Sequence, residues 1–139
     1  MQDELKSIKK EKAIYYATGK RKTSIACVWL TAGNGKILFN KKELVDVRVH
    51  TSIKDSISKP LHLTNTADKY DIRAQVIGGG VRGQAEAVMY GIAKALNTIS
   101  EEYHRILKAE GLLTRDSRIV ERKKYFRKKA RKRTQYRKR

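Results

Sequence analysis

The stretch Tyr70-Asp71-Ile72-Arg73-Ala74-Gln75-Val76-Ile77-Gly78-Gly79-Gly80-Val81-Arg82-Gly83 decides the fold class of this chain. Its first eight residues alternate between apolar or small side chains and polar ones, which predicts a β-strand with two different faces. Three glycines follow, and residues 81–110 then carry an apolar stripe at helical spacing, made of Ala85, Val88, Met89, Ile92, Ala93, Leu96 and Ile99. A strand that leads directly into amphipathic helix predicts a small α/β domain with helices backing a sheet.

The helical segment is predicted to divide at Ser100. Serine is a good N-cap residue, and Glu101 and Glu102 suit the positive end of a helix dipole. Gly111 is the expected C-terminal stop of this second helix, because glycine readily takes the left-handed conformation that ends helices.

Three further strands are predicted upstream of this stretch, at Tyr15–Thr18, Ser24–Thr31 and Ile37–Phe39. Ala32–Lys36 contains two glycines and an asparagine and is a strong turn signal. We therefore expect the second and third strands to pair as a hairpin.

The segment between this hairpin and Tyr70 has weaker signals. Asn40 is predicted to cap a short helix that runs through Val45, and residues 46–58 are also expected to be helical. Pro60 is expected to end that helix, since proline lacks the backbone N–H that a helix interior needs.

Charge separates the chain into parts. The 139 residues carry a net charge of +19, yet residues 115–139 alone hold 14 Lys or Arg and two acids, Asp116 and Glu121. We predict a charged N-terminal extension (1–12), a globular α/β domain (13–114, the body) and an extended basic segment (115–139, the tail). The tail has too few apolar groups to offset the entropy of ordering it, so alone it should be disordered.

This composition limits the classes of partner. Such an excess of positive charge suits a dense polyanion, because neutralised phosphates release their counterions. No membrane partner is predicted, since no stretch approaches the roughly 18 apolar residues of a spanning helix. One cysteine, Cys27, excludes a disulfide framework or a thiolate zinc site made by this chain alone.

The glycine loop formally satisfies the G-x-G-x-x-G pattern of nucleotide-binding folds. Such folds need a second parallel strand after the helix, and here a second helix and the tail follow instead. Two roles remain open with equal weight: the loop contacts RNA phosphate, or its glycines only allow close packing of helix and strand.

The chain shows no catalytic constellation. His50, His62 and His104 are scattered, and no nucleophile motif surrounds Thr23 or Ser24. We therefore predict no enzyme activity, no cofactor, no metal and no small-molecule substrate.

Four motifs in order resemble one known family, the small-subunit ribosomal protein nine family of bacterial and organellar type. They are Tyr15-Tyr16-Ala17-Thr18-Gly19-Lys20-Arg21-Lys22-Thr23-Ser24, Gly33-Asn34-Gly35-Lys36-Ile37, Gly78-Gly79-Gly80-Val81-Arg82-Gly83-Gln84-Ala85, and the run from Gly111 to Lys124 that continues through Lys128–Arg133. The resemblance covers about residues 14–139.

The resemblance implies a fold of the ribosomal S5 domain 2-like type, with a mixed four- to five-stranded sheet and two helices on one face. It implies a structural protein of the small-subunit head, bound to small-subunit rRNA and to neighbouring head proteins. It also implies that the tail threads through rRNA to the P site and contacts tRNA there.

These implications select the candidate site residues. Those expected to bind rRNA are Thr18, Lys20, Arg21, Lys22, Thr23, Gly79, Gly80, Arg82, Gln84, Arg115, Arg118, Arg122, Lys123, Lys124, Arg127, Lys128, Lys129, Arg131, Lys132 and Arg133. Lys138 and Arg139 are expected to contact tRNA, with Tyr136 and Arg137 as further candidates.

The chain departs from the family pattern at two positions. Arg137 stands where a small serine is usual, and Cys27 stands where a basic residue is frequent. The lysine-rich, single-proline composition suggests an AT-rich genome and, with the details of the tail, favours an alphaproteobacterial or mitochondrial ribosome. Two compartments therefore stay open, the bacterial cytoplasm and the mitochondrial matrix. The rival function is a free RNA chaperone or nucleoid-type binder with a promiscuous tail.

Overall fold

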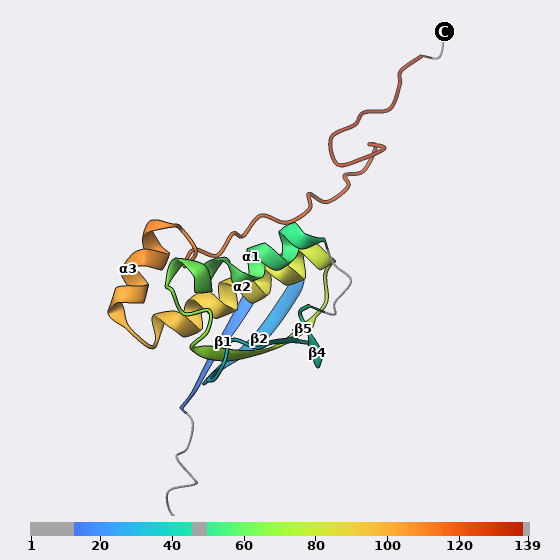
Figure 1. Ribbon diagram of the computed structural model, residues 1–139. Helices are drawn as coiled ribbons and strands as arrows, with labels where there is room; N and C mark the ends of the chain where they lie inside the picture. Colours follow the sequence, from blue (N-terminus) through green and yellow to red (C-terminus); the bar gives the residue numbers. More distant parts are fainter. Residues whose placement is uncertain (1–12, 46–49, 138–139) are drawn as a thin grey trace, which may run out of the picture.

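The computed structural model describes residues 13–45 and 50–137. Its elements are β1 (Ile14–Arg21), β2 (Ser24–Ala32), β3 (Ile37–Phe39), β4 (Lys42–Glu43), α1 (Thr51–Leu63), β5 (Tyr70–Ile77), α2 (Val81–Asn97) and α3 (Glu101–Ala109). The five strands form one sheet in the order β1-β2-β5-β3-β4, with β3 parallel to β5 and the other pairs antiparallel. The helices lie together on one side of this sheet (Figure 1). The mixed α/β fold expected from the resemblance is confirmed, with three helices in the described residues rather than two.

The strand at Tyr70–Ile77 occupies the centre of the sheet, as its alternating pattern suggests. Its residues Ile72, Ala74 and Val76 face the helices and are buried. The predicted hairpin of the second and third strands is wrong, because β5 lies between them. β2 pairs along its length with β1 on one edge and β5 on the other, and these long ladders outweigh the local turn signal.

The turn after β2 instead carries the chain across the start of β5, from β2 on one side of that strand to β3 on the other. The Asp71 carboxylate accepts hydrogen bonds from the backbone N–H of Asn34 (2.8 Å) and of Lys36 (3.0 Å). The backbone N–H of Gly33 donates to the Lys69 carbonyl at 3.0 Å. The glycine-rich turn is thereby fixed to β5, and β3 enters the sheet on its far side.

The α2 helix packs closely on β1 and β2 because small residues face each other there. A Cβ atom at Gly19 would lie 1.9 Å from the Ala87 carbonyl oxygen, and one at Gly91 would lie 2.6 Å from Val28 Cγ2. α1 and α3 pack against α2. The core between these layers is apolar and fully buried at its centre, with Val28, Leu30, Ile57, Leu61, Ile72, Val88, Ile92, Leu96 and Leu107.

Two helix predictions differ from the structure: the short helix predicted from Asn40 through Val45 is absent, and the helix expected to end at Pro60 continues beyond it. Asn40 begins no helix: it and Lys41 have left-handed φ angles of 48° and 70°, and β4 follows. The Asn40 side chain instead donates to the Val76 carbonyl (3.2 Å) and accepts from the Val76 N–H (2.7 Å), which extends the sheet beside β5.

Pro60 lies inside α1, which continues to Leu63. The proline leaves the Ser56 carbonyl without its helical donor, but its ring is buried in the core, and this packing offsets the missing bond. The first residues of the predicted helix, 46–49, lie outside the described residues.

The starts and ends of the later helices follow the prediction. The Ser100 hydroxyl accepts from the Glu102 N–H at 3.2 Å and caps α3. Gly111 has a φ of 70° just after α3, as a C-terminal stop requires. None of the helices in the described part of the chain is long and apolar enough to cross a membrane.

Candidate nucleic-acid interface

Three segments that are distant in sequence meet at one end of the sheet: the β1–β2 turn, the glycine loop before α2, and residues 115–120 of the tail (the tail root). The Ser24 hydroxyl donates to the Gly78 carbonyl at 3.1 Å and joins the first two segments. A shallow hollow there is lined by Arg21, Lys22, Arg82, Gly83, Glu86, Arg118, Ile119 and Val120. Four of these eight residues are cations, so the hollow is electropositive.

The glycine loop has a clear packing role. Gly78 and Gly79 both have φ near 70°, and a Cβ at Gly79 would lie 1.9 Å from the Ser24 hydroxyl oxygen. Gly80 is the N-cap of α2 and offers no side chain to cap it. The packing role is therefore evident in the structure, and the first amides of α2 remain next to Arg82, where an anion would be favoured.

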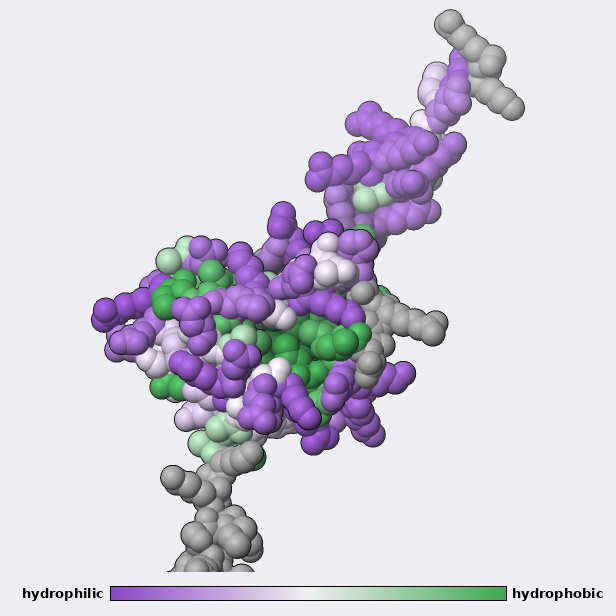
Figure 2. Space-filling model, viewed as in Figure 1, coloured by the Kyte–Doolittle hydropathy of each residue, from purple (hydrophilic) through white to green (hydrophobic). Residues whose placement is uncertain are grey.

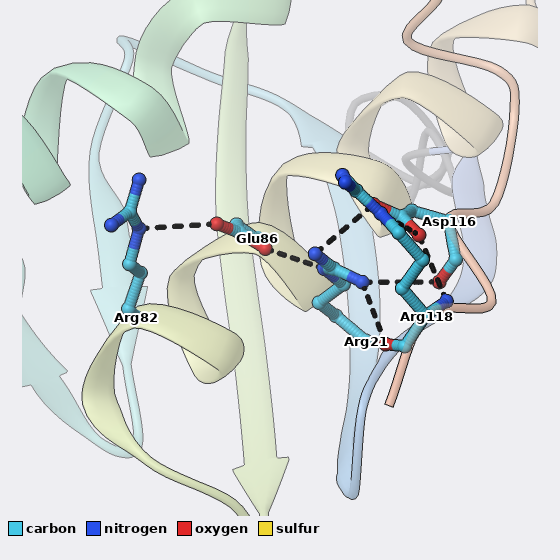
Figure 3. Close-up of polar contacts among 5 residues, drawn as sticks. All are labelled: Arg21, Arg82, Glu86, Asp116 and Arg118. Atoms are coloured by element: carbon cyan, nitrogen blue, oxygen red, sulfur yellow. Dashed lines mark hydrogen bonds and ion pairs between the residues drawn. The ribbon is translucent and has the colours of Figure 1, made fainter. Parts of the chain in front are cut away.

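Arg21 is the centre of an ion-pair network that joins β1, α2 and the tail (Figure 3). Its Nε donates to Glu86 Oε2 at 2.6 Å, and its Nη2 lies 3.0 Å from Asp116 Oδ2. Its Nη1 donates to the backbone carbonyls of Arg118 (3.1 Å) and Asp116 (3.3 Å). Only 15% of the Arg21 side chain is exposed, so its charge is engaged inside the protein.

Two further arginines complete the network. The Arg118 guanidinium donates hydrogen bonds from Nε and Nη2 to the Asp116 carboxylate, with 2.7 Å between Nη2 and Oδ2. Arg82 lies at 3.4 Å from the other oxygen of Glu86 and is 87% exposed. Hydrogen bonds from the side chain and backbone of Arg118 hold the pKa of Asp116 well below its ordinary value of 3.8, and the positive charges of Arg118 and Arg21 add to this.

The tail contains a second, local ion-pair cluster. Glu121 Oε1 accepts from Lys124 Nζ at 2.5 Å, and Oε2 accepts from Arg131 Nε at 2.8 Å. These contacts close a loop of residues 121–133 (the tail loop), supported by a hydrogen bond from the Lys128 N–H to the Lys132 carbonyl at 3.0 Å. Hydrogen bonds from Lys124 and Arg131 lower the pKa of Glu121 to about 2.

The surface of the tail is almost entirely hydrophilic, whereas apolar surface gathers over the body (Figure 2). The tail extends away from the sheet and helices (Figure 1). Its aromatic residues Tyr125, Phe126 and Tyr136 are 83%, 90% and 98% exposed. Exposed aromatic rings among cations are the groups that stack on unpaired bases.

Comparison with known proteins identifies the relatives of this chain. Residues 19–139 match the family model for ribosomal protein S9/S16. The chain belongs to the ribosomal protein S9/S16 family. Relatives named small ribosomal subunit protein uS9 include those of Rickettsia africae (53% identity), Rickettsia peacockii (52%) and Rickettsia felis (51%), each over 125 residues. These alignments cover 90% of this chain and 79%, 79% and 78% of the three relatives.

Membership of this ribosomal family settles the class of protein. The chain is a ribosomal protein and not an enzyme, which confirms the prediction from the sequence. The residues of the glycine loop thus belong to a ribosomal protein rather than to a nucleotide-dependent enzyme. Among the described residues, no cluster of His, Cys, Asp or Glu could hold a metal ion.

The structure brings most of the body's candidate residues together at the same end of the sheet, whereas Thr18 lies further along β1, opposite Cys27. Lys20, Lys22, Thr23, Gly79, Gly80 and Arg82 are exposed, and Thr18 and Gln84 are half-buried. Arg21 is instead engaged by Glu86 and Asp116. The Gln84 amide donates to the Gly78 carbonyl at 3.1 Å and steadies the glycine loop.

The tail's candidate cations are spread along an exposed chain. Arg115, Arg118, Arg122, Lys123, Lys124, Lys128, Lys129, Arg131, Lys132 and Arg133 are exposed, and Arg127 is half-buried, with its Nη1 on the Arg131 carbonyl at 2.9 Å. Tyr136 and Arg137 are exposed. Lys138 and Arg139, the candidates for tRNA contact, lie outside the described residues.

Sequence reasoning missed the acids of the interface. Glu86, Asp116 and Glu121 were not candidates, yet each holds two cations in place. For Asp116 and Glu121, the signal that could have found them is their rarity, since they are the two acids of the strongly cationic residues 115–139, whereas Glu86 in α2 carries no such signal. The Arg73 guanidinium over the Trp29 ring at 5.8 Å, on the open face of the sheet, was also missed.

Proposed function

We propose that this ribosomal protein is a structural component of the head of the small subunit, where it binds small-subunit rRNA and contacts neighbouring head proteins. The observation that carries this proposal is the +12 tail, a projecting segment whose described cations are nearly all exposed. Neutralisation of phosphates by such a segment drives association through counterion release.

On the body, the proposed rRNA contact is the end of the sheet where the β1–β2 turn meets the glycine loop. Lys20, Lys22 and Arg82 supply charge there, and Thr18, Thr23 and Gln84 supply polar groups. The amides of Gly79 and Gly80 lie beside the start of α2, where the helix dipole favours phosphate. Arg21 supports this surface indirectly, because its ion pairs orient Glu86 and, through Asp116, the tail root.

In the tail, residues 115–133 are proposed as the rRNA anchor and the C-terminus as the tRNA-contacting part. Arginine offers bidentate contacts to phosphate and stacks on bases, while lysine acts as a point charge. Lys138 and Arg139 match the family ending and are proposed to reach the tRNA in the P site, with Tyr136 and Arg137 beside them.

Of the two compartments left open by the sequence, the bacterial cytoplasm is favoured. The relatives with about half of their residues identical come from Rickettsia, which are bacteria. Neither a membrane nor a small-molecule substrate forms part of the proposal.

A high-salt wash separates this function from that of a free RNA chaperone or nucleoid-type binder. Small subunits that carry the protein are sedimented at rising salt, and the protein that remains bound is measured. A specific component stays bound at about 0.5 M monovalent salt, whereas a purely electrostatic binder dissociates steeply over this range. Complete loss of the protein at that salt, with the other head proteins retained, would overturn the proposal.

A further inference from the structure

The tail is fixed to the body before it projects from it. Leu112 is buried in the core, and its N–H donates to the Leu107 carbonyl at 3.0 Å, which turns the chain back after α3. Residues 111–118 then pass along β1 and α2, around a hollow lined by Lys20, Tyr90, Leu112 and Asp116 among others. The ion-pair network around Arg21 then joins the tail to β1 and α2 (Figure 3).

We propose that Asp116 is a positioning residue that fixes the direction in which the tail leaves the body. Its carboxylate contacts Arg21 from β1 and Arg118 from the tail at once. Arg21 in turn binds the backbone carbonyls of both Asp116 and Arg118, so that it holds main chain as well as side chain. Two points of main-chain attachment restrict the orientation of the segment more than a side-chain ion pair alone does.

The base of this attachment is rigid. Arg21 is the last residue of β1, is paired with Ser24 across the turn, and is held by Glu86 of α2 at 2.6 Å. Glu86 and Asp116 expose 29% and 33% of their side chains, so solvent screens these pairs less than it screens fully exposed ones. The tail root is therefore connected to two packed elements of the body.

Charge supports the same conclusion. If attraction to RNA were the only requirement on the tail root, an acid beside Arg115, Arg118 and Arg21 would be unfavourable, because it weakens that attraction. Asp116 instead uses its negative charge to orient Arg118, whose side chain is 85% exposed and available to RNA on its other side. A pre-oriented segment loses less conformational entropy when it binds, which favours affinity.

The direction of the tail is a property of the free protein, but its benefit to RNA binding rests on the proposed function. The two are measured separately. Spin labels are placed at Glu102→Cys in α3 and Val120→Cys in the tail, in a Cys27→Ser background, and the distance distribution is recorded by pulsed electron spin resonance. Both label sites are exposed and outside the network.

Three variants are compared with the parent in this measurement. Asp116→Asn removes the carboxylate, Asp116→Glu keeps it, and Asp55→Asn makes the same charge change at an exposed site of α1. We expect a narrow distribution in the parent and in Asp55→Asn, a broad one in Asp116→Asn, and an intermediate one in Asp116→Glu. An Asp116→Asn distribution as narrow as that of the parent would overturn the proposal.

The second measurement is binding to small subunits that lack the protein. Asp116→Asn should bind about five-fold more weakly than the parent, in the range of a partly shielded ion pair, although its net charge is more favourable to RNA. Asp55→Asn should bind equally or slightly better. Equal binding of the two variants would overturn the role of Asp116 in RNA binding. Failure of the parent to bind would contradict the proposed function, but it would not change the conclusion from the label distances. Circular dichroism confirms that each variant is folded.

Discussion

The body and the tail are ordered by different interactions. The body encloses a continuous apolar core between sheet and helices, and its shape depends on packing. None of the described tail residues, 115–137, is buried, and their contacts are mainly ion pairs and hydrogen bonds made by Asp116 and Glu121. The shape of the body should therefore withstand changes of charge and salt, while that of the tail should not. This difference agrees with the proposed function, in which the tail adapts to folded RNA.

Removal of the tail tests this separation most strongly. Deletion of Arg115–Arg139 removes a net charge of +12 and should lower affinity for small subunits by about a thousand-fold at moderate salt. The body should keep its fold, because its core lies in residues before the deletion. Binding and circular dichroism check the two halves of this prediction. Normal retention of the truncated protein would mean that the tail is not an anchor.

A substitution in the core should lower the stability of the fold, whereas a matched substitution in the tail should not. Ile92→Ala at a fully buried position of α2 should lower the free energy of unfolding by about 2–5 kcal/mol. The matched tail variant, Val120→Ala, should change it by no more than about 0.5 kcal/mol, because Val120 is 82% exposed. Denaturation in urea measures both. A similar loss in the two variants would show that the tail contributes to the folded core.

The end of the tail should act on tRNA alone. The double variant Lys138→Gln/Arg139→Gln should speed dissociation of P-site tRNA by about ten-fold and leave assembly of the subunit intact, since two phosphate contacts are lost. The control Lys128→Gln/Lys129→Gln makes the same charge change within the tail loop and should leave tRNA dissociation unchanged. Equal effects of the two variants on tRNA would remove the distinction between anchor and tip.

The smallest expected effect is the titration of the tail loop. Hydrogen bonds from Lys124 and Arg131 lower the pKa of Glu121 from its ordinary value of 4.5 to about 2. Because the pKa is lowered, the stabilisation of the loop is fully present above pH 4.5 and is lost as the pH falls through about 2. Carbon-13 chemical shifts of the Glu121 carboxyl should show this low midpoint, and salt near 1 M should raise it toward 4.5 because the contacts are exposed. A midpoint near 4.5 at low salt would show that the loop is open in solution.

Local patterns predicted the elements that depend on near neighbours. The alternation at Tyr70–Ile77, the apolar stripe that forms α2, the Ser100 cap and the Gly111 stop were all confirmed. Pairing of strands was not predictable in this way, since the turn at Ala32–Lys36 suggested a hairpin that the longer ladders of β5 exclude. Asn40 and Pro60 were misread because their roles depend on Val76 and on the core.

The candidate interface shows the same limit. Exposed cations such as Lys22 and Lys128 are visible in the sequence as runs of charge, and the structure leaves them exposed. The role of Arg21 was not visible, because its partner Asp116 lies 95 residues further along the chain. Sequence reasoning located the cationic segments and missed the acids that orient them. The contacts of both segments with RNA stay predictions.

A structure of the small subunit with this protein bound and its C-terminus traced tests the central claim most directly. It should place the β1–β2 turn and residues 115–133 against rRNA, keep Asp116 between Arg21 and Arg118, and bring Lys138 and Arg139 to the tRNA in the P site. A tail that lies on the solvent side of the subunit, or that reaches RNA with Asp116 separated from Arg21, would contradict it.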